Sequence, residues 1–166
     1  MDQAARTSDF FLKALIVYED MVTGKQAKET CDSLALELGP DWQIEMEASS
    51  FKSLQIPQLQ EYATAAATNS DLILFSCYGQ KLPKEVWRWT ELNLKRSNQP
   101  KALIAHVDNT RSPAGSSLKM EQYLADLARR RGMRFFAHHP IGPQATRPLS
   151  SSVLFSLNPR MNSSLN

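Results

Sequence analysis

The sequence lacks several features that would each point to a class of protein. Two of its 166 residues are cysteines, Cys31 and Cys77, too few for a disulfide framework or a cysteine-based zinc motif. No apolar run approaches the roughly 20 residues that a membrane-spanning helix needs. The N-terminal stretch Met-Asp-Gln-Ala-Ala-Arg lacks the basic and apolar segments of a signal peptide. These absences predict a cytoplasmic protein that does not enter a membrane.

An excess of charge of one sign is also missing. The 19 basic and 17 acidic residues give a formal net charge of +2 at pH 7, and the surplus corresponds to Arg147 and Arg160. A nucleic-acid-binding protein concentrates Lys and Arg on one face. The nearest approach here is Arg129, Arg130 and Arg131 at the expected end of a helix, where basic side chains also favour the helix dipole. We therefore expect no nucleic-acid partner.

What the sequence does contain is a regular alternation of two apolar patterns. Short aliphatic and aromatic runs predict strands at residues 12–18, 42–47, 72–75, 102–107 and 134–137. Apolar residues that repeat every three or four positions predict helices at residues 24–38, 57–68, 83–96 and 117–131. Strands alternating with helices favour a parallel sheet with helices on both faces. The expected fold class is α/β, a three-layer α/β/α flavodoxin-like sandwich with a five-stranded parallel sheet in the order 2-1-3-4-5.

The ends of the chain differ in composition from its middle. Residues 1–9 are polar and are expected to form a flexible N-terminus. Residues 10–140 hold all the predicted strands and helices and are expected to form one α/β domain. Residues 141–166 are rich in Pro, Ser and Asn, and their one apolar cluster is Val153-Leu154-Phe155. This tail is either disordered or loosely docked on the domain through that cluster.

Two tryptophans lie two positions apart in the third predicted helix. Trp87 and Trp89 cannot both face the sheet, because residues two apart on a helix do not share a face. One of them is expected in the core, and the other, together with Trp42, on an exposed patch. An exposed apolar patch is typical of a partner surface. We therefore expect an unidentified protein partner, and a homodimer is left open.

The strand order predicts where a binding site lies. In an open α/β sheet, ligands bind at the carboxyl ends of the strands where the order reverses, here between the first and third strands. Polar residues follow several of the predicted strands at this end of the sheet. The candidate residues of this crevice are Glu19, Asp20, Thr23, Ser76, Cys77, Tyr78, His106, Asp108 and His139.

Alternative roles are open to these residues. Glu19 and Asp20 are either turn residues that cap the first helix or site residues that hold a metal ion, for which Mg²⁺ is the candidate. A turn through Thr23-Gly24 is expected between them and the helix. Cys77 and His106 are either a nucleophile and its base or, more simply, a buried structural cysteine beside a histidine.

The layout of the crevice resembles that of a response-regulator receiver domain, over roughly residues 12–140. Glu19-Asp20 match the acidic pair that receivers carry after their first strand. Ser76, or Cys77 if the register slips by one, stands at the position of the phosphorylated Asp. His106 falls near the position of the receiver hydroxyl residue, and His139-Pro140 stands where receivers have Lys-Pro.

Phosphoryl transfer to a receiver needs a carboxylate acceptor, a Mg²⁺ ion and a Lys cation. The acceptor Asp and the Lys are both replaced here, so the resemblance is to a pseudo-receiver. It implies a non-catalytic regulatory or protein-binding module for which no cofactor is expected. Whether the protein is an enzyme is left open, and the resemblance favours a protein that is not. The pattern V-Y-E-D-x-x-T-G-x-x-A-K, from Val17 to Lys28, and Leu82-Pro83 also resemble a group of small bacterial proteins without an assigned function.

A second resemblance implies a different function. Ser76-Cys77-Tyr78-Gly79 followed by Leu82-Pro83 is similar to the flavin-flanking loop of flavodoxins, and Thr23-Gly24 to part of their phosphate loop. This resemblance implies a flavin- or nucleotide-binding protein with FMN as the cofactor, bound at the ends of the first and third strands and stacked on Tyr78. Glu19 and Asp20 depart from that pattern, because they would repel an arriving phosphate. Flavin binding is therefore the alternative to the regulatory module.

Overall fold

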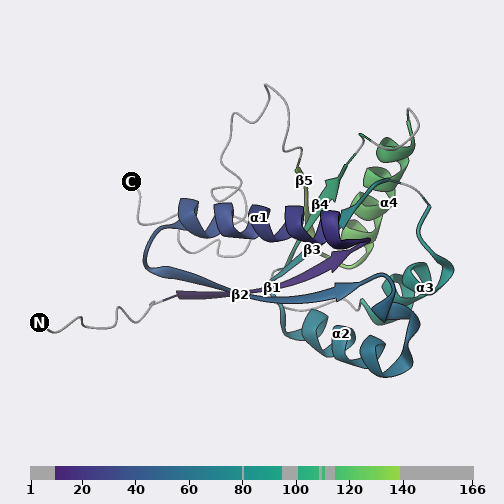
Figure 1. Ribbon diagram of the computed structural model, residues 1–166, viewed down its shortest axis with the longest axis horizontal. Coiled ribbons are helices and arrows are strands. Elements are labelled where there is room, and N and C mark those ends of the chain that lie inside the picture. Colours follow the sequence, from purple (N-terminus) through teal and green to yellow (C-terminus); the bar gives the residue numbers. More distant parts are fainter. Residues whose placement is uncertain (1–9, 80, 95–100, 109, 111–114, 139–166) are drawn as a thin grey trace, which may run out of the picture.

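One parallel sheet forms the centre of the computed structural model, which describes residues 10–79, 81–94, 101–108, 110 and 115–138 (Figure 1). The strands are β1 (Phe10–Tyr18), β2 (Trp42–Ser50), β3 (Leu72–Cys77), β4 (Ala102–Val107) and β5 (Arg134–His138). The helices that the described residues form are α1 (Met21–Leu38), the short 3₁₀ helix η1 (Ser53–Gln55), α2 (Pro57–Asn69), α3 (Lys84–Asn93) and α4 (Ser116–Arg130). The predictions for residues 1–9, His139 and residues 141–166 lie outside the described residues.

The strands pair in the order β2-β1-β3-β4-β5, all parallel. Helix α1 covers one face of the sheet, and α2, α3 and α4 cover the other (Figure 1). The predicted α/β class and strand order are therefore confirmed, and the fold is flavodoxin-like. Among the described helices, none combines the length and the apolar character required to cross a membrane.

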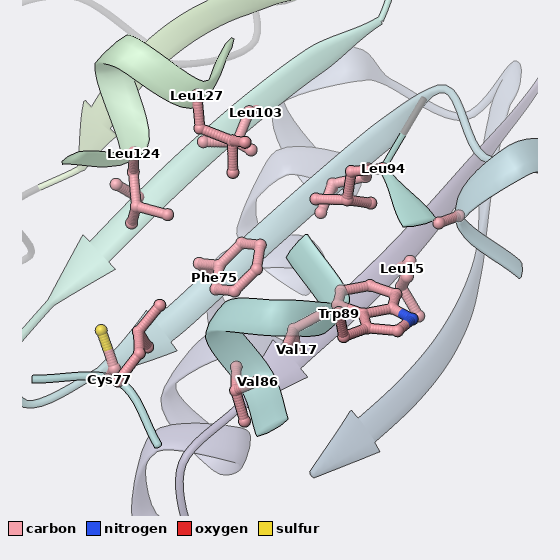
Figure 2. Close-up of a cluster of buried hydrophobic side chains, with 14 of the residues drawn as sticks. Leu15, Val17, Phe75, Cys77, Val86, Trp89, Leu94, Leu103, Leu124 and Leu127 are labelled. Atoms are coloured by element: carbon pink, nitrogen blue, oxygen red, sulfur yellow. The ribbon is translucent and has the colours of Figure 1, made fainter. Parts of the chain in front are cut away.

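The larger core cluster lies between the sheet and α2, α3 and α4 (Figure 2). All residues of β3 and β4 are buried, as expected for strands covered on both faces. Phe75 of β3 lies between Leu124 of α4 and Trp89 of α3 (Figure 2). The indole N–H of Trp89 donates to the hydroxyl of Thr64 in α2 at 3.0 Å, so the one polar atom of this ring is satisfied within the core.

Sequence periodicity identified the buried faces of α1 and α4 but not that of α2. In α2, Ala63 and Ala66 are buried as predicted, while Leu59 and Tyr62, expected on the same face, are 41% and 52% exposed. The physical reason is the small size of the alanines, with Ala67 beside them. They bring the helix backbone close to the sheet, so the bulky side chains at the rim of the contact lie outside it.

The three tryptophans do not share a surface. Trp89 is 1% exposed and Trp87 is 50% exposed, which confirms that one of the pair faces the core. Trp42 of β2 packs on the α1 side of the sheet, where it stacks on Phe10 with ring centroids 5.0 Å apart. Because α3 covers the opposite face, the predicted patch shared by Trp42 and the exposed tryptophan of α3 is wrong.

Helix α1 begins earlier than the sequence pattern suggested. Asp20 is its N-cap and Met21 its first residue, so the turn expected at Thr23-Gly24 is wrong. Gly24 instead lies in the second half of the first turn, against the ring of Tyr18. A Cβ atom added to Gly24 would lie 2.9 Å from Tyr18 Cδ2 and 3.1 Å from Tyr18 Cγ. Glycine therefore lets the helix approach the aromatic ring closely.

A buried lysine closes the C-terminal end of α2. Lys101 precedes β4 and is 8% exposed, and its ammonium group donates to the carbonyl oxygens of Ala67 at 2.6 Å and Thr68 at 2.9 Å. These carbonyls belong to the last turn of the helix, where intrahelical partners run out. Burial lowers the pKa of Lys101, partly offset by nearby Asp71. The sequence pattern gave no sign of this cap.

The arginine cluster near the end of α4 makes intramolecular contacts. The Arg130 guanidinium forms a bidentate ion pair with Glu91 of α3, at 2.8 and 2.9 Å. Arg131 donates to the Glu91 backbone carbonyl, and Arg129 pairs with Asp126. The cluster thus ties the end of α4 to the end of α3, and its charge is partly neutralised by neighbouring carboxylates.

The close approach of Gly24 to Tyr18 predicts that Gly24→Ala destabilises the wild-type protein but stabilises a variant without the tyrosine ring. Gly24→Ala should lower the free energy of unfolding by about 1 kcal/mol, because overpacking against a ring outweighs alanine's better helix propensity. In a Tyr18→Ala background the same substitution should stabilise the protein, since the ring is gone. Urea denaturation of the four proteins of this cycle measures both effects, and equal effects in the two backgrounds would contradict the contact.

Candidate functional site

The carboxyl ends of β1, β3 and β4 meet beneath the first turn of α1. Strand register pairs Tyr18 with Ser76 and Ser76 with His106. Beyond the strands, the Glu19 N–H donates to the Ser76 carbonyl at 3.0 Å, and the Asp108 N–H to the Cys77 carbonyl at 2.8 Å. The predicted crevice residues that are described therefore come together at this edge of the sheet, apart from the Cys77 side chain.

The Asp20 carboxylate occupies the N-terminus of α1. It accepts from the Thr23 N–H at 2.9 Å, while the Thr23 hydroxyl accepts from the Asp20 N–H at 2.9 Å, and this reciprocal pair is a capping box. The Tyr78 hydroxyl donates to both Asp20 oxygens, at 3.1 and 2.9 Å. Burial opposes ionisation of this carboxyl, but hydrogen bonds from Thr23, Tyr78 and the Val22 backbone outweigh it and lower the pKa of Asp20.

The second member of the acidic pair is bound to the backbone of β3's following loop. Glu19 Oε2 accepts from the Tyr78 N–H at 2.8 Å. Together with the bond from the Tyr78 hydroxyl, this fixes the tyrosine at both ends, and its side chain is 6% exposed. The pair Glu19-Asp20 thus holds the β3–α3 loop against the start of α1.

Ser76 and His106 form a buried polar pair at the centre of the crevice. They are 0% and 1% exposed, and Ser76 Oγ lies 3.0 Å from His106 Nδ1. The Ser76 hydroxyl also lies 2.8 Å from the Thr23 carbonyl, which can only accept. The serine hydroxyl has one proton, and it donates that proton to the carbonyl. The contact with His106 is therefore made by the Nδ1–H of the imidazole, which donates to Ser76 Oγ. His106 is therefore not placed to deprotonate Ser76.

Cys77 faces away from this pair. Successive strand residues point to opposite faces, so Cys77 lies in the core cluster between the sheet and α2, α3 and α4 (Figure 2). Strand register pairs it with Val107 rather than His106. Burial raises the pKa of the Cys77 thiol to about 12, which keeps it protonated. The nucleophile–base reading of Cys77 and His106 is wrong, and the structural reading holds.

Asp108 is held by residues that the sequence did not single out. Its carboxylate accepts from the Thr110 hydroxyl at 2.6 Å, the Thr110 N–H at 2.9 Å and the Gln26 amide at 3.1 Å. The Thr110 hydroxyl bond is the largest contribution that lowers the pKa of Asp108. Asp followed two residues later by Thr is a turn signal that could have predicted this contact. The contact from Gln26 joins α1 to the end of β4.

A second histidine lies beside His106. Strand register pairs it with His138 of β5, and the two rings are 5.9 Å apart between centroids. The sequence did not place His138 in the crevice, although parallel pairing of the last two strands would have done so. His139, which was placed there, is outside the described residues.

The residues present do not fit a Mg²⁺ site. Among the described residues, no group of three or more His, Cys, Asp and Glu side chains could hold a metal ion. Oxygens of Glu19 and Asp20 already accept from Tyr78 and Thr23. A hard cation needs several oxygen ligands turned toward one point, and this acidic pair is turned toward the protein's own donors.

The crevice also does not fit FMN bound as the sequence resemblance implied. A phosphate at a helix N-terminus requires free backbone N–H groups, and Asp20 takes the Thr23 N–H at the start of α1. The negative charge of that carboxylate would repel a phosphate in the same place. Tyr78 is 6% exposed, so its ring offers no open face for an isoalloxazine to stack on.

Comparison with known proteins shows the fold alone. No family model matches the sequence, and no curated protein matches it. A short-chain flavodoxin associated with a non-canonical PDU bacterial microcompartment aligns with 88% of this chain and 96% of its own, at 15% identity and a TM-score of 0.50. Smu.1420 from Streptococcus mutans UA159 aligns with 86% and 96%, at 12% identity and a TM-score of 0.45. The chain has a flavodoxin-like fold.

The capping role of Asp20 predicts a pH-dependent loss of stability on substitution. Asp20→Ala should lower the free energy of unfolding at pH 7 by about 1–2 kcal/mol, the usual effect of removing an N-cap. Because the folded-state pKa is lowered, the charged contribution is present above the unfolded value of about 4 and is lost as pH falls through the folded value. The difference from the wild type should therefore shrink below about pH 4.

Urea denaturation across pH measures this difference. Asp32→Ala is the matched control, since Asp32 forms an exposed ion pair with Lys28 on the same helix and such pairs contribute little. A control effect as large as that of Asp20→Ala would show that removing any carboxylate from α1 has the same result.

Burial of both cysteines predicts a protein inert to thiol reagents. Cys31 and Cys77 are each 1% exposed, and burial raises both pKa values to about 12. At pH 8 the native protein should react with Ellman's reagent only as fast as it unfolds, while the protein in denaturant should release two thiolate equivalents at once. Rapid reaction of one thiol in the native state would contradict the placement of Cys77.

Proposed function

We propose that this protein is a non-catalytic regulatory or protein-binding module built on a flavodoxin-like fold. The proposal rests on one observation: the reactive side chains of the crevice form hydrogen bonds with one another or with the backbone. Asp20, Glu19 and Tyr78 bind one another or the backbone, and Ser76 and His106 are bound within the protein. Groups that hold the first turn of α1 in place are not oriented to act on a substrate.

Phosphoryl transfer is the activity most directly disfavoured by this arrangement. It requires an acceptor in line with the donor and cations that neutralise the developing charge. Ser76 is fully buried and donates its proton to a backbone carbonyl. Asp108 is the remaining carboxylate at the ends of the central strands, and it is held by Thr110 and Gln26.

A binding role agrees with apolar side chains exposed around the crevice. Met21 is 80% exposed and Val22 45% exposed at the start of α1. They line a groove of about 960 Å³ with Met46 of β2, on the α1 side of the sheet. Exposed apolar groups gathered along a groove are typical of partner surfaces, which supports a protein partner.

Flavin binding is the alternative function. It is favoured by the description of one structural neighbour as a short-chain flavodoxin. The filled N-terminus of α1 and the buried ring of Tyr78 argue against it for this chain.

The proposal predicts that the protein is neither phosphorylated nor coloured. Incubation with acetyl phosphate and Mg²⁺ should leave the intact mass unchanged, and the purified protein should show no flavin absorbance and no added flavin mass. A receiver domain with its acceptor Asp, treated in parallel, is the positive control for the phosphodonor. A gain of one phosphoryl group, lost in Asp108→Asn, would replace the proposal with a true phosphoacceptor. Bound FMN would replace it with the flavin alternative.

A further inference from the structure

A second cavity lies on the other side of the sheet from α1. It occupies about 860 Å³ between the N-terminal half of α3 and the second turn of α4, next to the loop that follows β3. Its lining includes Lys81, Lys84, Lys119, Trp87, Met120 and Tyr123. Pockets of roughly 300–1,000 Å³ are the usual size for small ligands. The lining also includes Gly79 and Leu82 of the loop that follows β3, but none of the candidate crevice residues.

The charge of this α3–α4 groove has one sign. Lys81, Lys84 and Lys119 are exposed, and none of them forms an ion pair with any residue in the described part of the chain. Glu85, in the first turn of α3, is not part of the lining. Three ammonium groups around one cavity favour an anionic occupant.

The N-terminal ends of α3 and α4, which lie beside the groove, also favour a negatively charged occupant. The N-caps of α3 and α4, Pro83 and Gly115, make no side-chain cap hydrogen bond, in contrast to Asp20 of α1. An N-terminus without a capping carboxylate keeps its partial positive charge. Lys84 is the first residue of α3 and Lys119 the fourth of α4, and both line the groove, so each adds positive charge at the N-terminal turn of its helix.

The remaining walls are aromatic and apolar. Trp87 is 50% exposed, which leaves much of the indole uncovered at the groove. Tyr123 is fixed by its hydroxyl, which lies 2.7 Å from Thr90 Oγ1 and 3.1 Å from Glu91 Oε1. Its pKa is raised to about 12, mainly by burial, so the ring stays neutral. An uncovered indole and neighbouring apolar groups favour a planar aromatic partner.

We infer that the α3–α4 groove binds a small planar aromatic anion, such as an aromatic carboxylate or sulfonate. The anionic group lies among the three lysines at the helix ends, and the ring packs on Trp87 and Met120. This inference goes beyond the proposed function and does not depend on it, because it uses none of the crevice residues.

The probe for this site is 1-anilinonaphthalene-8-sulfonate, an aromatic anion whose fluorescence rises on transfer to an apolar surface. Titration should give saturable binding with one site per chain, weakened by added salt. Trp87→Ala should weaken the affinity about tenfold, the effect expected for loss of one stacking ring. The double variant Lys84→Ala, Lys119→Ala should weaken it by at least about tenfold, as loss of two near charges implies. An uncharged analogue, N-phenyl-1-naphthylamine, should bind at least about tenfold less tightly for the same reason.

The matched control is Lys25→Ala, Lys28→Ala, which removes two lysines from the groove beside α1. It should bind the probe like the wild type. Thermal melts of all variants establish that each is folded, and should Trp87→Ala fail to fold, the lysine double variant and the uncharged analogue decide the question.

Four outcomes would overturn the inference: no saturable binding, binding lost in the control rather than in the α3–α4 variants, equal affinity for the uncharged analogue, or displacement by inorganic phosphate as effective as by an aromatic anion. The last would mean a simple anion site. None of these results bears on phosphorylation or on flavin content, so failure here is distinct from failure of the proposed function.

Discussion

The structure at the carboxyl edge of the sheet depends on the carboxylate of Asp20. By accepting the Thr23 N–H it fixes the residue at which α1 begins, and this places the Thr23 carbonyl where Ser76 donates to it. By accepting the Tyr78 hydroxyl it holds the loop after β3 against the same helix. One charged group at a helix end, where backbone donors are otherwise unpaired, thus joins two segments that are far apart in the sequence: the start of α1 and the end of β3 with its following loop. The edge at which open α/β sheets bind ligands is held together here by these contacts.

The fold could be predicted because its signals are local and repeated. Apolar runs such as 72–75 and 102–107 are too short for helices and too apolar for exposed strands, and strict alternation with helices leaves few topologies. The start of α1 was misjudged because Thr23-Gly24 has the composition of a turn. In the structure Thr23 completes a capping box and Gly24 allows the helix to approach Tyr18 closely. In the sequence, neither arrangement can be distinguished from a turn.

The sequence predicted that the candidate residues lie at one edge of the sheet, but it did not show what their side chains bind. An aspartate that caps a helix and one that binds a ligand occupy the same position and look alike. Because side chains alternate along β3, Ser76 faces His106 and Cys77 faces the core cluster. In a strand that is apolar throughout, the sequence does not show which residues point to which face of the sheet. Gln26 reaches Asp108 from a helix that follows another strand, a contact that tertiary structure alone defines. A shared fold does not by itself carry a shared function.

The chemical reactivity of the Lys101 amine depends on how far the protein has folded. Its ammonium group reaches the carbonyls of Ala67 and Thr68 across the strand that separates α2 from β4, so it is enclosed once β4 has paired with β3. Until then the amine is open to any acylating reagent, and afterwards it is shielded. If an amine-labelling reagent is added as a pulse at different times of refolding, the loss of labelling at Lys101 therefore reports when β4 pairs with β3. In the native protein the same enclosure places Lys101 out of reach of enzymes that modify lysine side chains.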